Sequence, residues 1–323
     1  MKQKYTPTQV QYRELCHTEA LPLMLQYWWL DAVCPGQWDV FLYKESGHVV
    51  ASFAYHIRRK GGMRFLLLPP HTQYGGLWIK NTPTDYTQRL TYEKRLMTHL
   101  IERIDSLRLH YAEINLHFSI TNHLPFHWKG WKQTTRYTYL IDRIGNTEKC
   151  VSRFSPAKQR QIRKAQGRFT LDMDLSPDEF YAFHKTCLHD SGRGSIDYDY
   201  AFFLRLWKAA TARKQGQIFA LRDREGRIHT AHFIVWDRAS AYDLLYFIRP
   251  EYASSGASTL IVMEILQYLQ QKTRAFDFEG SMIEGVENSY RQFGTQQRPY
   301  HHLVRPYSPL AAWLLRLKQR LRK

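Results

Sequence analysis

The order of helical and extended patterns along the chain constrains its fold more than any other feature of the sequence. Short apolar runs of strand length alternate with longer stretches in which apolar residues recur at helical spacing. Each half of the chain shows the same order: a helix, several antiparallel strands, a second helix, a strand, a short helix and a last strand. This order predicts an α/β (α+β) fold of two similar units, each with a mostly antiparallel sheet flanked by helices.

The predicted elements divide the chain into two units and a tail. In the first half, helices are predicted over 21–33 and 85–109, and strands over 38–43, 49–57, 63–68, 111–118 and 136–141. In the second half, helices are predicted over 150–166, 177–189, 200–213 and 256–271, with a short one ending at 293–294, and strands over 217–221, 228–236, 242–248, 275–278 and 298–304. We therefore expect units at 1–145 and 146–305, followed by a tail at 306–323.

The charge balance favours a polyanionic partner. The 323 residues include 46 Lys and Arg against 29 Asp and Glu, which gives a formal net charge of +17. Such an excess is typical of proteins that bind nucleic acid, an anionic membrane surface or a phosphate-bearing ligand, and it does not choose among them. One segment, 149–168, holds seven cations and no acid: Lys149, Arg153, Lys158, Arg160, Arg163, Lys164 and Arg168.

The tail from 310 to 323 combines leucines and Trp313 at helical spacing with a series of cations. This pattern is typical of an interfacial helix on an anionic membrane, and also of a terminal helix that docks on its own domain. Both interpretations stay open on the sequence alone.

Cysteine and histidine usage argues against disulfide and metal chemistry. The four cysteines lie far apart and form no CxxC pair, which predicts a reducing compartment and no structural zinc site. The histidines form no HExxH pair, so a metal hydrolase is disfavoured and no metal ligands are assigned. We find neither a signal-like N-terminus nor an apolar run near the ~20 residues of a spanning helix. We expect a cytoplasmic protein, with peripheral contact at the inner membrane face left open.

Three stretches of the second half carry a family resemblance. They read SRFS at 152–155 with RQIRKA at 160–165, RPEYASSGA at 249–257, and FDFEGS at 276–281 continuing to YRQFG at 290–294. Together with the element order, they resemble the tandem-GNAT proteins related to the FemABX peptidyltransferases. The resemblance is good over 150–305, whereas over 1–145 only the element order supports it.

The resemblance implies two GNAT-like units and a transferase activity. Proteins of this kind move an acyl or aminoacyl group onto an amine, often in cell-envelope synthesis. The implied donor is an acyl-CoA or an aminoacyl-tRNA, and the second unit is the one expected to be active.

Two carboxylates on one predicted strand are the first candidate catalytic residues. Asp277 and Glu279 share one face of the strand by its period of two, while Phe276 and Phe278 share the other. Buried carboxylates without partners are costly, so one of them is a candidate base or amine-positioning group. We favour Glu279, which adjoins Gly280. The alternative is that both face a solvated groove or pair with the many cations.

Tyr246 is the third candidate catalytic residue. It shares a strand face with Tyr242, and its hydroxyl could protonate a leaving thiolate or hold the donor carbonyl. The alternative is a core tyrosine with a solvated hydroxyl. His232, on the neighbouring strand, is interpreted as a core histidine rather than a base.

The segment Ser254, Ser255, Gly256 and Ala257 is the candidate donor-binding loop. Small residues let a phosphate approach the backbone, and the first amides of a helix bind anions. The alternative is an ordinary serine-rich helix cap. Arg291 could pair with a donor phosphate, or it could be a surface cation.

These patterns favour an N-acyltransferase that moves an acyl or aminoacyl group from a CoA thioester or an aminoacyl-tRNA to an amine, such as that of a cell-envelope precursor. The competing hypothesis is a non-catalytic GNAT-fold module that binds RNA or an anionic membrane. The two carboxylates at Asp277 and Glu279 favour the enzyme over the binding module.

Overall fold

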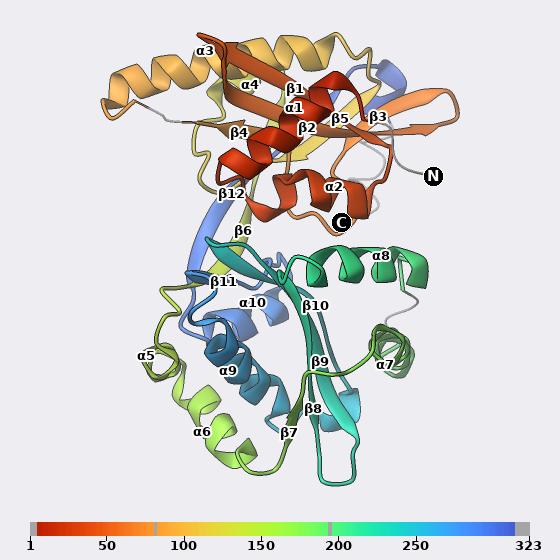
Figure 1. Ribbon diagram of the computed structural model, residues 1–323, viewed down its shortest axis with the longest axis vertical. Coiled ribbons are helices and arrows are strands. Elements are labelled where there is room, and N and C mark those ends of the chain that lie inside the picture. The colour runs from red at the N-terminus through yellow and green to blue at the C-terminus, as the bar shows by residue number, and fades with distance from the viewer. Residues whose placement is uncertain (1–4, 81–82, 193–195, 314–323) are drawn as a thin grey trace. The chain divides into compact units, whose positions relative to one another are not determined.

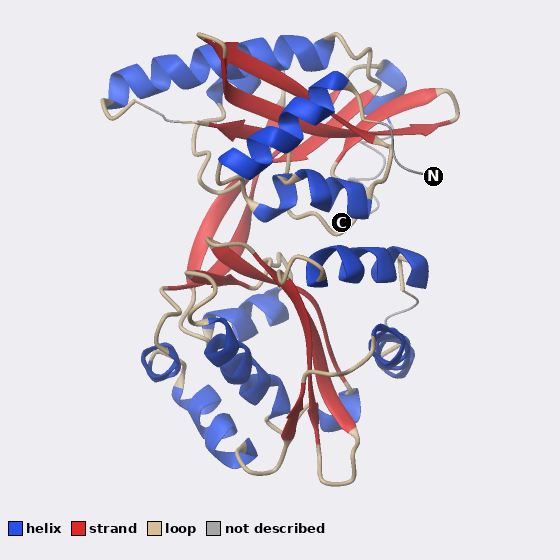
Figure 2. Cartoon of the chain, in the orientation of Figure 1, coloured by secondary structure: helices blue, strands red, loops and turns tan. Residues whose placement is uncertain are grey.

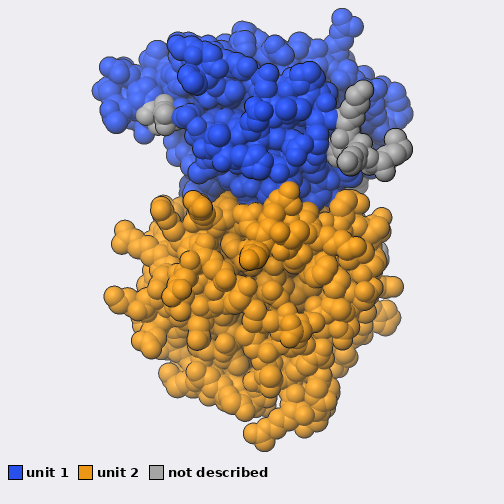
Figure 3. All heavy atoms as spheres, viewed as in Figure 1, with its two compact units in different colours: residues 1–136, 299–323 blue, residues 137–298 orange. Residues whose placement is uncertain are grey.

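The chain divides into two compact units in a computed structural model that describes residues 5–80, 83–192 and 196–313. One unit comprises 1–136 with 299–323, and the other comprises 137–298 (Figure 3). Strands β6 (Lys132–Asp142) and β12 (Gln296–Pro306) each run across the boundary between the units. The boundaries expected at 145 and 305 are therefore replaced by positions inside these two strands.

The first unit has a mixed sheet with helices around it. Its strand order is β1-β2-β3-β5-β12, with the short β4 also paired to β2, and only the β3–β5 pair in it is parallel among the pairings given. The strands are β1 (Trp38–Glu45), β2 (His48–Lys60), β3 (Met63–Leu67), β4 (Leu77–Ile79) and β5 (Tyr111–Asn115). The helices are α1 (Pro7–Thr18), α2 (Tyr27–Val33), α3 (Tyr86–Asp105) and α4 (Leu124–Trp128).

The second unit repeats this plan with one strand order, β6-β11-β10-β9-β8-β7. All of these pairs are antiparallel except β10–β11 (Figure 2). The strands are β7 (Thr170–Asp172), β8 (Gly216–Arg222), β9 (Ile228–Trp236), β10 (Ser240–Ile248) and β11 (Ala275–Asp277). The helices are α5 (Thr147–Ser152), α6 (Pro156–Ala165), α7 (Pro177–Asp190), α8 (Tyr200–Thr211), α9 (Ala257–Leu269) and α10 (Glu284–Arg291).

The single helix predicted over 150–166 is two helices, α5 and α6. The Ser155 side chain accepts the amide of Lys158 and so caps the start of α6, and Pro156 occupies its first turn. Proline lacks the N–H that a helix interior needs but fits the first turn, so the break at Ser155-Pro156 follows from local chemistry.

Both faces of the second sheet are covered, which buries β9 along nearly its whole length. Helices α7 and α8 cover one face, where the rings of Phe180, Phe203 and Phe233 pack together, with centroids 5.1–6.5 Å apart (Figure 1). Helices α5, α6, α9 and α10 cover the other face around Phe276 and Phe278. Burial on both sides explains why these strands have continuous apolar runs.

The N-terminus of α9 packs tightly against α6. Gly256 begins this helix with a φ of +85°, and a Cβ built on it would lie 2.9 Å from the carbonyl oxygen of Gln161 and 3.2 Å from the Cβ of Ala165. Only glycine fits both the left-handed backbone and the close approach of the two helices.

This packing yields the first prediction, on Gly256→Ala with Gly226→Ala as its matched control. Both glycines have positive φ, but a Cβ on Gly226 would meet nothing within 4 Å. We expect Gly226→Ala to lower the free energy of unfolding by about 1 kcal/mol through backbone strain alone. Gly256→Ala should cost at least twice as much, because α6 must also move. Urea denaturation of both variants measures the difference, and equal losses would contradict the tight α6–α9 contact.

Candidate active site

The parallel pair β10–β11 opens after three residues. Its register ends with Tyr242 opposite Asp277, after which β10 continues along β9 to Ile248 while β11 stops. The chain beyond β11 turns through two consecutive left-handed residues, Glu279 (φ 59°) and Gly280 (φ 69°). A Cβ on Gly280 would lie 2.1 Å from the Tyr137 carbonyl oxygen, so glycine is required here. A left-handed glutamate is strained, and such strain is often found at functional sites.

Asp277 is fully buried at this opening. Its Oδ1 accepts hydrogen bonds from the Thr138 hydroxyl and from the Glu279 amide at 2.8 Å. Its Oδ2 has no hydrogen-bond partner among the described residues. Burial raises the pKa of Asp277 to about 7, although the hydrogen bonds from Thr138 and Glu279 lower it in part.

Glu279 is the second acid of the opening, and Asp243 of β10 is the third. Burial raises the pKa of Glu279 well above its usual value, and the nearby charges of Asp277 and Asp243 raise it further. Three interacting carboxylates in a buried place cannot all be ionised together. The cluster therefore holds protons near neutral pH, and a cation entering it would favour the ionised forms.

Asp243 is joined to His232 of β9. The His232 Nδ1 lies 2.9 Å from one oxygen of Asp243 and 3.2 Å from the other, and both side chains are buried. The Nε2 of His232 is buried without a partner in the described part of the chain. The expectation of a plain core histidine therefore misses its carboxylate partner.

Tyr246 stands at the exposed edge of the same cluster. It is 39% exposed, and its ring stacks on His232 with 5.5 Å between centroids. Its hydroxyl shares a hydrogen bond with the buried Tyr290 of α10, whose pKa is raised by burial and then by Tyr246. The structure thus brings the three predicted catalytic residues, Asp277, Glu279 and Tyr246, to one opening.

A β-bulge in β10 lies between the acids and the tyrosine. Asp243 pairs with Ile234 and Leu245 with Phe233, so Leu244 has no residue opposite it. A bulged residue leaves the regular ladder, and its backbone groups become available for other partners.

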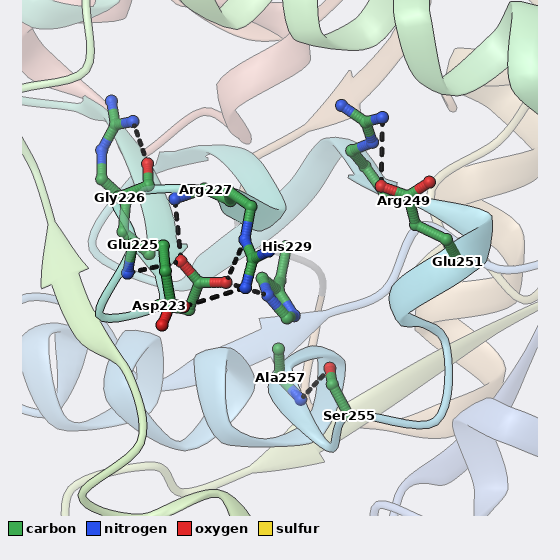
Figure 4. Close-up of polar contacts among 10 residues, drawn as sticks. Asp223, Glu225, Gly226, Arg227, His229, Arg249, Glu251, Ser255 and Ala257 are labelled. Carbon is green, nitrogen blue, oxygen red and sulfur yellow. Dashed lines mark hydrogen bonds and ion pairs between the residues drawn. The ribbon is translucent and has the colours of Figure 1, made fainter.

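The predicted donor loop lies at the end of β10 and leads into α9. The Ser255 hydroxyl accepts the Ala257 amide at 3.2 Å, while Gly256 provides no side-chain cap (Figure 4). Arg249, where the loop begins, bonds to Glu251 at 3.1 Å. Gly256 is explained by the contact with α6, so its presence alone does not indicate a ligand.

A polar cluster on β8 and β9 lies beside this loop. Asp223 accepts bonds from Arg227 at 2.7 Å and lies 3.0 Å from the Nε2 of His229, whose ring stacks on Tyr252 at 3.8 Å (Figure 4). These contacts hold the loop residue Tyr252 against the sheet.

Arg291 does not join the cluster of acids. Its side chain is 63% exposed, and it contacts Asn288 at 2.8 Å and Glu287 at 3.9 Å on its own helix. The contacts of Arg291 are therefore those of a surface arginine.

Sequence reasoning missed three residues of this region as functional candidates: Asp243, Tyr290 and Lys158. Asp243 and Tyr290 reach the opening only because β10 bulges and α10 folds back over the sheet. Lys158 was counted as one of seven cations in 149–168, although it is buried. Its helical spacing with the buried Ile162 and Ala165 was the available signal.

The corresponding place in the first unit is closed. The parallel pair β3–β5 is only two residues long, and beyond it the Gly75 amide donates to the Asn115 carbonyl at 3.0 Å. The Asn115 side chain in turn donates to the Gln73 carbonyl at 2.6 Å. The loop before β4 thus joins the end of β5, and we assign the active site to the second unit.

Two further searches of the described residues gave negative results. No group of three or more His, Cys, Asp and Glu side chains there is arranged to hold a metal ion. No helix within the described ranges has the length and apolar character to cross a membrane. The tail beyond residue 313 lies outside the described residues, so its proposed amphipathic helix stays a prediction.

The raised pKa of Asp277 yields the second prediction, a pH dependence of stability. The pKa is about 7 in the folded protein and 3.8 for an ordinary aspartate, so the folded state binds more protons between these values. Stability from this residue is then present at low pH and lost as pH rises, by a total on the order of 4 kcal/mol. We expect the stability of Asp277→Asn relative to wild type to increase from about pH 4 to about pH 8.

Chemical denaturation across this pH range measures the effect, with the exposed Asp174→Asn as control. A relative stability of Asp277→Asn that does not change with pH would contradict the burial of an ionisable carboxyl at this position.

Comparison with known proteins agrees with this geometry. Residues 156–288 match the family model of the acetyltransferase (GNAT) domain. The structure is similar to that of FemX, with 10% identity and a TM-score of 0.69 over 93% of this chain and 97% of that one. It is also similar to L-PGS from Bacillus licheniformis (11% identity, TM-score 0.56, 88% and 89% covered) and to a tandem GNAT protein from the clavulanic acid biosynthesis pathway (10%, 0.56, 94% and 95%). No curated protein sequence matches the chain. The chain is thus a tandem-GNAT protein with a FemX-like fold.

Proposed function

We propose that the second unit transfers an acyl or aminoacyl group from a phosphate-bearing donor to a primary amine. The observation that carries this proposal is the convergence of Asp243, Asp277 and Glu279 where β10 and β11 separate. The GNAT domain match supports acyl transfer in general, and the FemX-like fold is compatible with an aminoacyl donor. An amine of a cell-envelope precursor is the acceptor we favour within this class.

The acidic cluster fits an acceptor that arrives as an ammonium ion. Its positive charge replaces the missing counter-ion of the buried carboxylates, which favours their ionised forms. Glu279 then accepts a proton from the ammonium and leaves a neutral amine as the nucleophile. Asp277 holds the Glu279 amide, and so fixes the strained backbone that aims this side chain.

The transfer forms a C–N bond and breaks the C–S bond of a thioester or the C–O bond of an aminoacyl ester. The backbone amide of the bulged Leu244 is available to hydrogen-bond the oxyanion that forms at the carbonyl. Tyr246 donates the proton that the leaving thiolate or hydroxyl group takes up, and its hydrogen bond to Tyr290 orients it. The proton released to Glu279 returns to solvent when the product leaves.

The donor is an acyl-CoA or an aminoacyl-tRNA, both of which carry phosphates. GNAT domains favour CoA thioesters in general, whereas the net charge of +17 and the basic helix α6 favour tRNA. The same basic helix is the observation that supports a second function, a non-catalytic module that binds RNA or an anionic membrane. A buried triad of acids has no use in such a module, so we place the transferase first.

The third prediction concerns Glu279→Gln, with the exposed Glu148→Gln on α5 as control. The amide keeps the shape of the side chain but cannot accept the acceptor's proton, so turnover should fall at least about tenfold. The melting temperature should be unchanged or higher, because a buried ionisable group is removed. Transfer is measured with a panel of acyl-CoA and aminoacyl-tRNA donors against primary amines.

Two outcomes would count against the assignment. If Glu279→Gln and Glu148→Gln turn over at the same rate, Glu279 is not the base. If no donor in the panel is consumed while RNA or anionic vesicles bind tightly, the binding module becomes the better hypothesis.

A further inference from the structure

Lys158 is a buried cation without a counter-ion. It is only 9% exposed, and its ammonium lies 3.4 Å from the Thr259 hydroxyl, 3.5 Å from the Ser289 hydroxyl and 4.3 Å from the centre of the Phe293 ring. No carboxylate in the described part of the chain forms an ion pair with it. A buried ammonium is normally paired with an anion, because removing it from water is costly.

The surroundings of Lys158 add positive charge instead of balancing it. Its own helix, α6, also carries Arg160, Arg163 and Lys164 and no acid. The start of α9, which has no side-chain cap, lies within one helical turn of Thr259. The positive end of a helix dipole disfavours a cation and favours an anion. Burial lowers the pKa of Lys158 to about 8, so the ammonium form still prevails at neutral pH.

The hydroxyl groups around Lys158 leave room for an additional ligand. The Thr259 hydroxyl donates to the Gln161 side chain at 2.6 Å, so its hydrogen is already committed. The Ser289 hydroxyl donates no hydrogen bond to any described residue and can donate to an anion. Both contacts of the ammonium are long for hydrogen bonds to a cation.

A column of aromatic rings connects this position to the acidic cluster. Phe278, directly after β11, stacks on Tyr290 at 4.9 Å and on Phe293 at 5.1 Å. Tyr290 bonds to Tyr246 at the opening, and Phe293 lies under the Lys158 ammonium. Lys158 and the acids thus contact the same face of α10, about one helical turn apart.

We propose that Lys158 binds a phosphate group of the acyl donor, with the Ser289 hydroxyl as a second donor to that phosphate. The inference rests on the proposed function, because it places a phosphate-bearing donor between α9 and α10 with its acyl group toward the acidic cluster. The ligand chemistry is a phosphodiester or diphosphate, which CoA and the 3′ end of a tRNA share.

The test compares Lys158→Met with Lys164→Met. Both variants remove one charge from α6, but Lys164 is exposed. Binding of inorganic pyrophosphate, CoA and the trinucleotide CCA to the full chain is measured by calorimetry. We expect Lys158→Met to weaken pyrophosphate binding at least about tenfold, whereas Lys164→Met changes it less than about threefold. Ser289→Ala, a milder variant, should weaken it in the same direction.

The other two probes identify the source of the phosphate. Weaker binding of CoA alone supports a CoA donor, and weaker binding of the trinucleotide alone supports a tRNA donor. Equal binding of all three probes by Lys158→Met, Ser289→Ala and wild type would overturn the inference. Pyrophosphate binding that depends on Lys158, without transfer from any donor, would retain the phosphate site and reject the proposed function.

Melting temperatures separate this role from a structural one. Lys158→Met should melt at or above the wild-type temperature without ligand, because an uncompensated charge leaves the interior. Wild type should gain more stability from pyrophosphate than the variant does. A destabilised variant whose pyrophosphate binding matches wild type would show that Lys158 only supports the packing of α6.

Discussion

The hydrogen bonds of Asp277 are the constraint on which the active-site geometry depends. The carboxylate lies at the last residue of a short parallel strand, where the ladder to β10 ends and the chain must turn away. Its Oδ1 binds the Thr138 hydroxyl of β6 and the amide of Glu279, so one oxygen ties the strand to its neighbour and to the turn. Because Gly280 packs directly on the Tyr137 carbonyl, the turn has one available path. That path holds Glu279 in a strained conformation beside two other acids.

The two units show how one architecture can provide an open site or a closed one. Both have a short parallel pair next to antiparallel strands, β3–β5 in the first unit and β10–β11 in the second. In the first unit, polar backbone groups beyond the pair are satisfied by the loop that bonds to Asn115. In the second, α9 starts soon after β10, so no such loop is present and side chains occupy the opening. The length of the connection after the first strand of the pair therefore decides which unit has an accessible site.

The sequence predicts most of the secondary structure because the periodicity is set by local burial. The strand expected at 228–236 has the observed bounds of β9, and alternation correctly places Asp277 and Glu279 in one region. Helix α1 was missed although Thr6 and Gln9 form a capping box, a signal that is present in the sequence. The convergence of Asp243 with the other acids could not be predicted, since it depends on the bulge in β10 and on where β11 ends. Likewise, charge counting cannot separate buried Lys158 from the exposed cations of its helix.

The second unit keeps uncompensated charges of both signs, and their separation has a physical consequence. Asp277 and Glu279 are buried acids that hold protons near neutral pH, and Lys158 is a buried cation with only hydroxyl contacts. If they lay together they would form an ion pair and neutralise each other. The aromatic column from Tyr290 to Phe293 keeps them apart and excludes water between them. A molecule with an anion at one end, approached by an amine at the other, would satisfy both charges at once. Such a pattern destabilises the empty unit and favours the bound state, so it is better explained by selection for binding than by selection for stability.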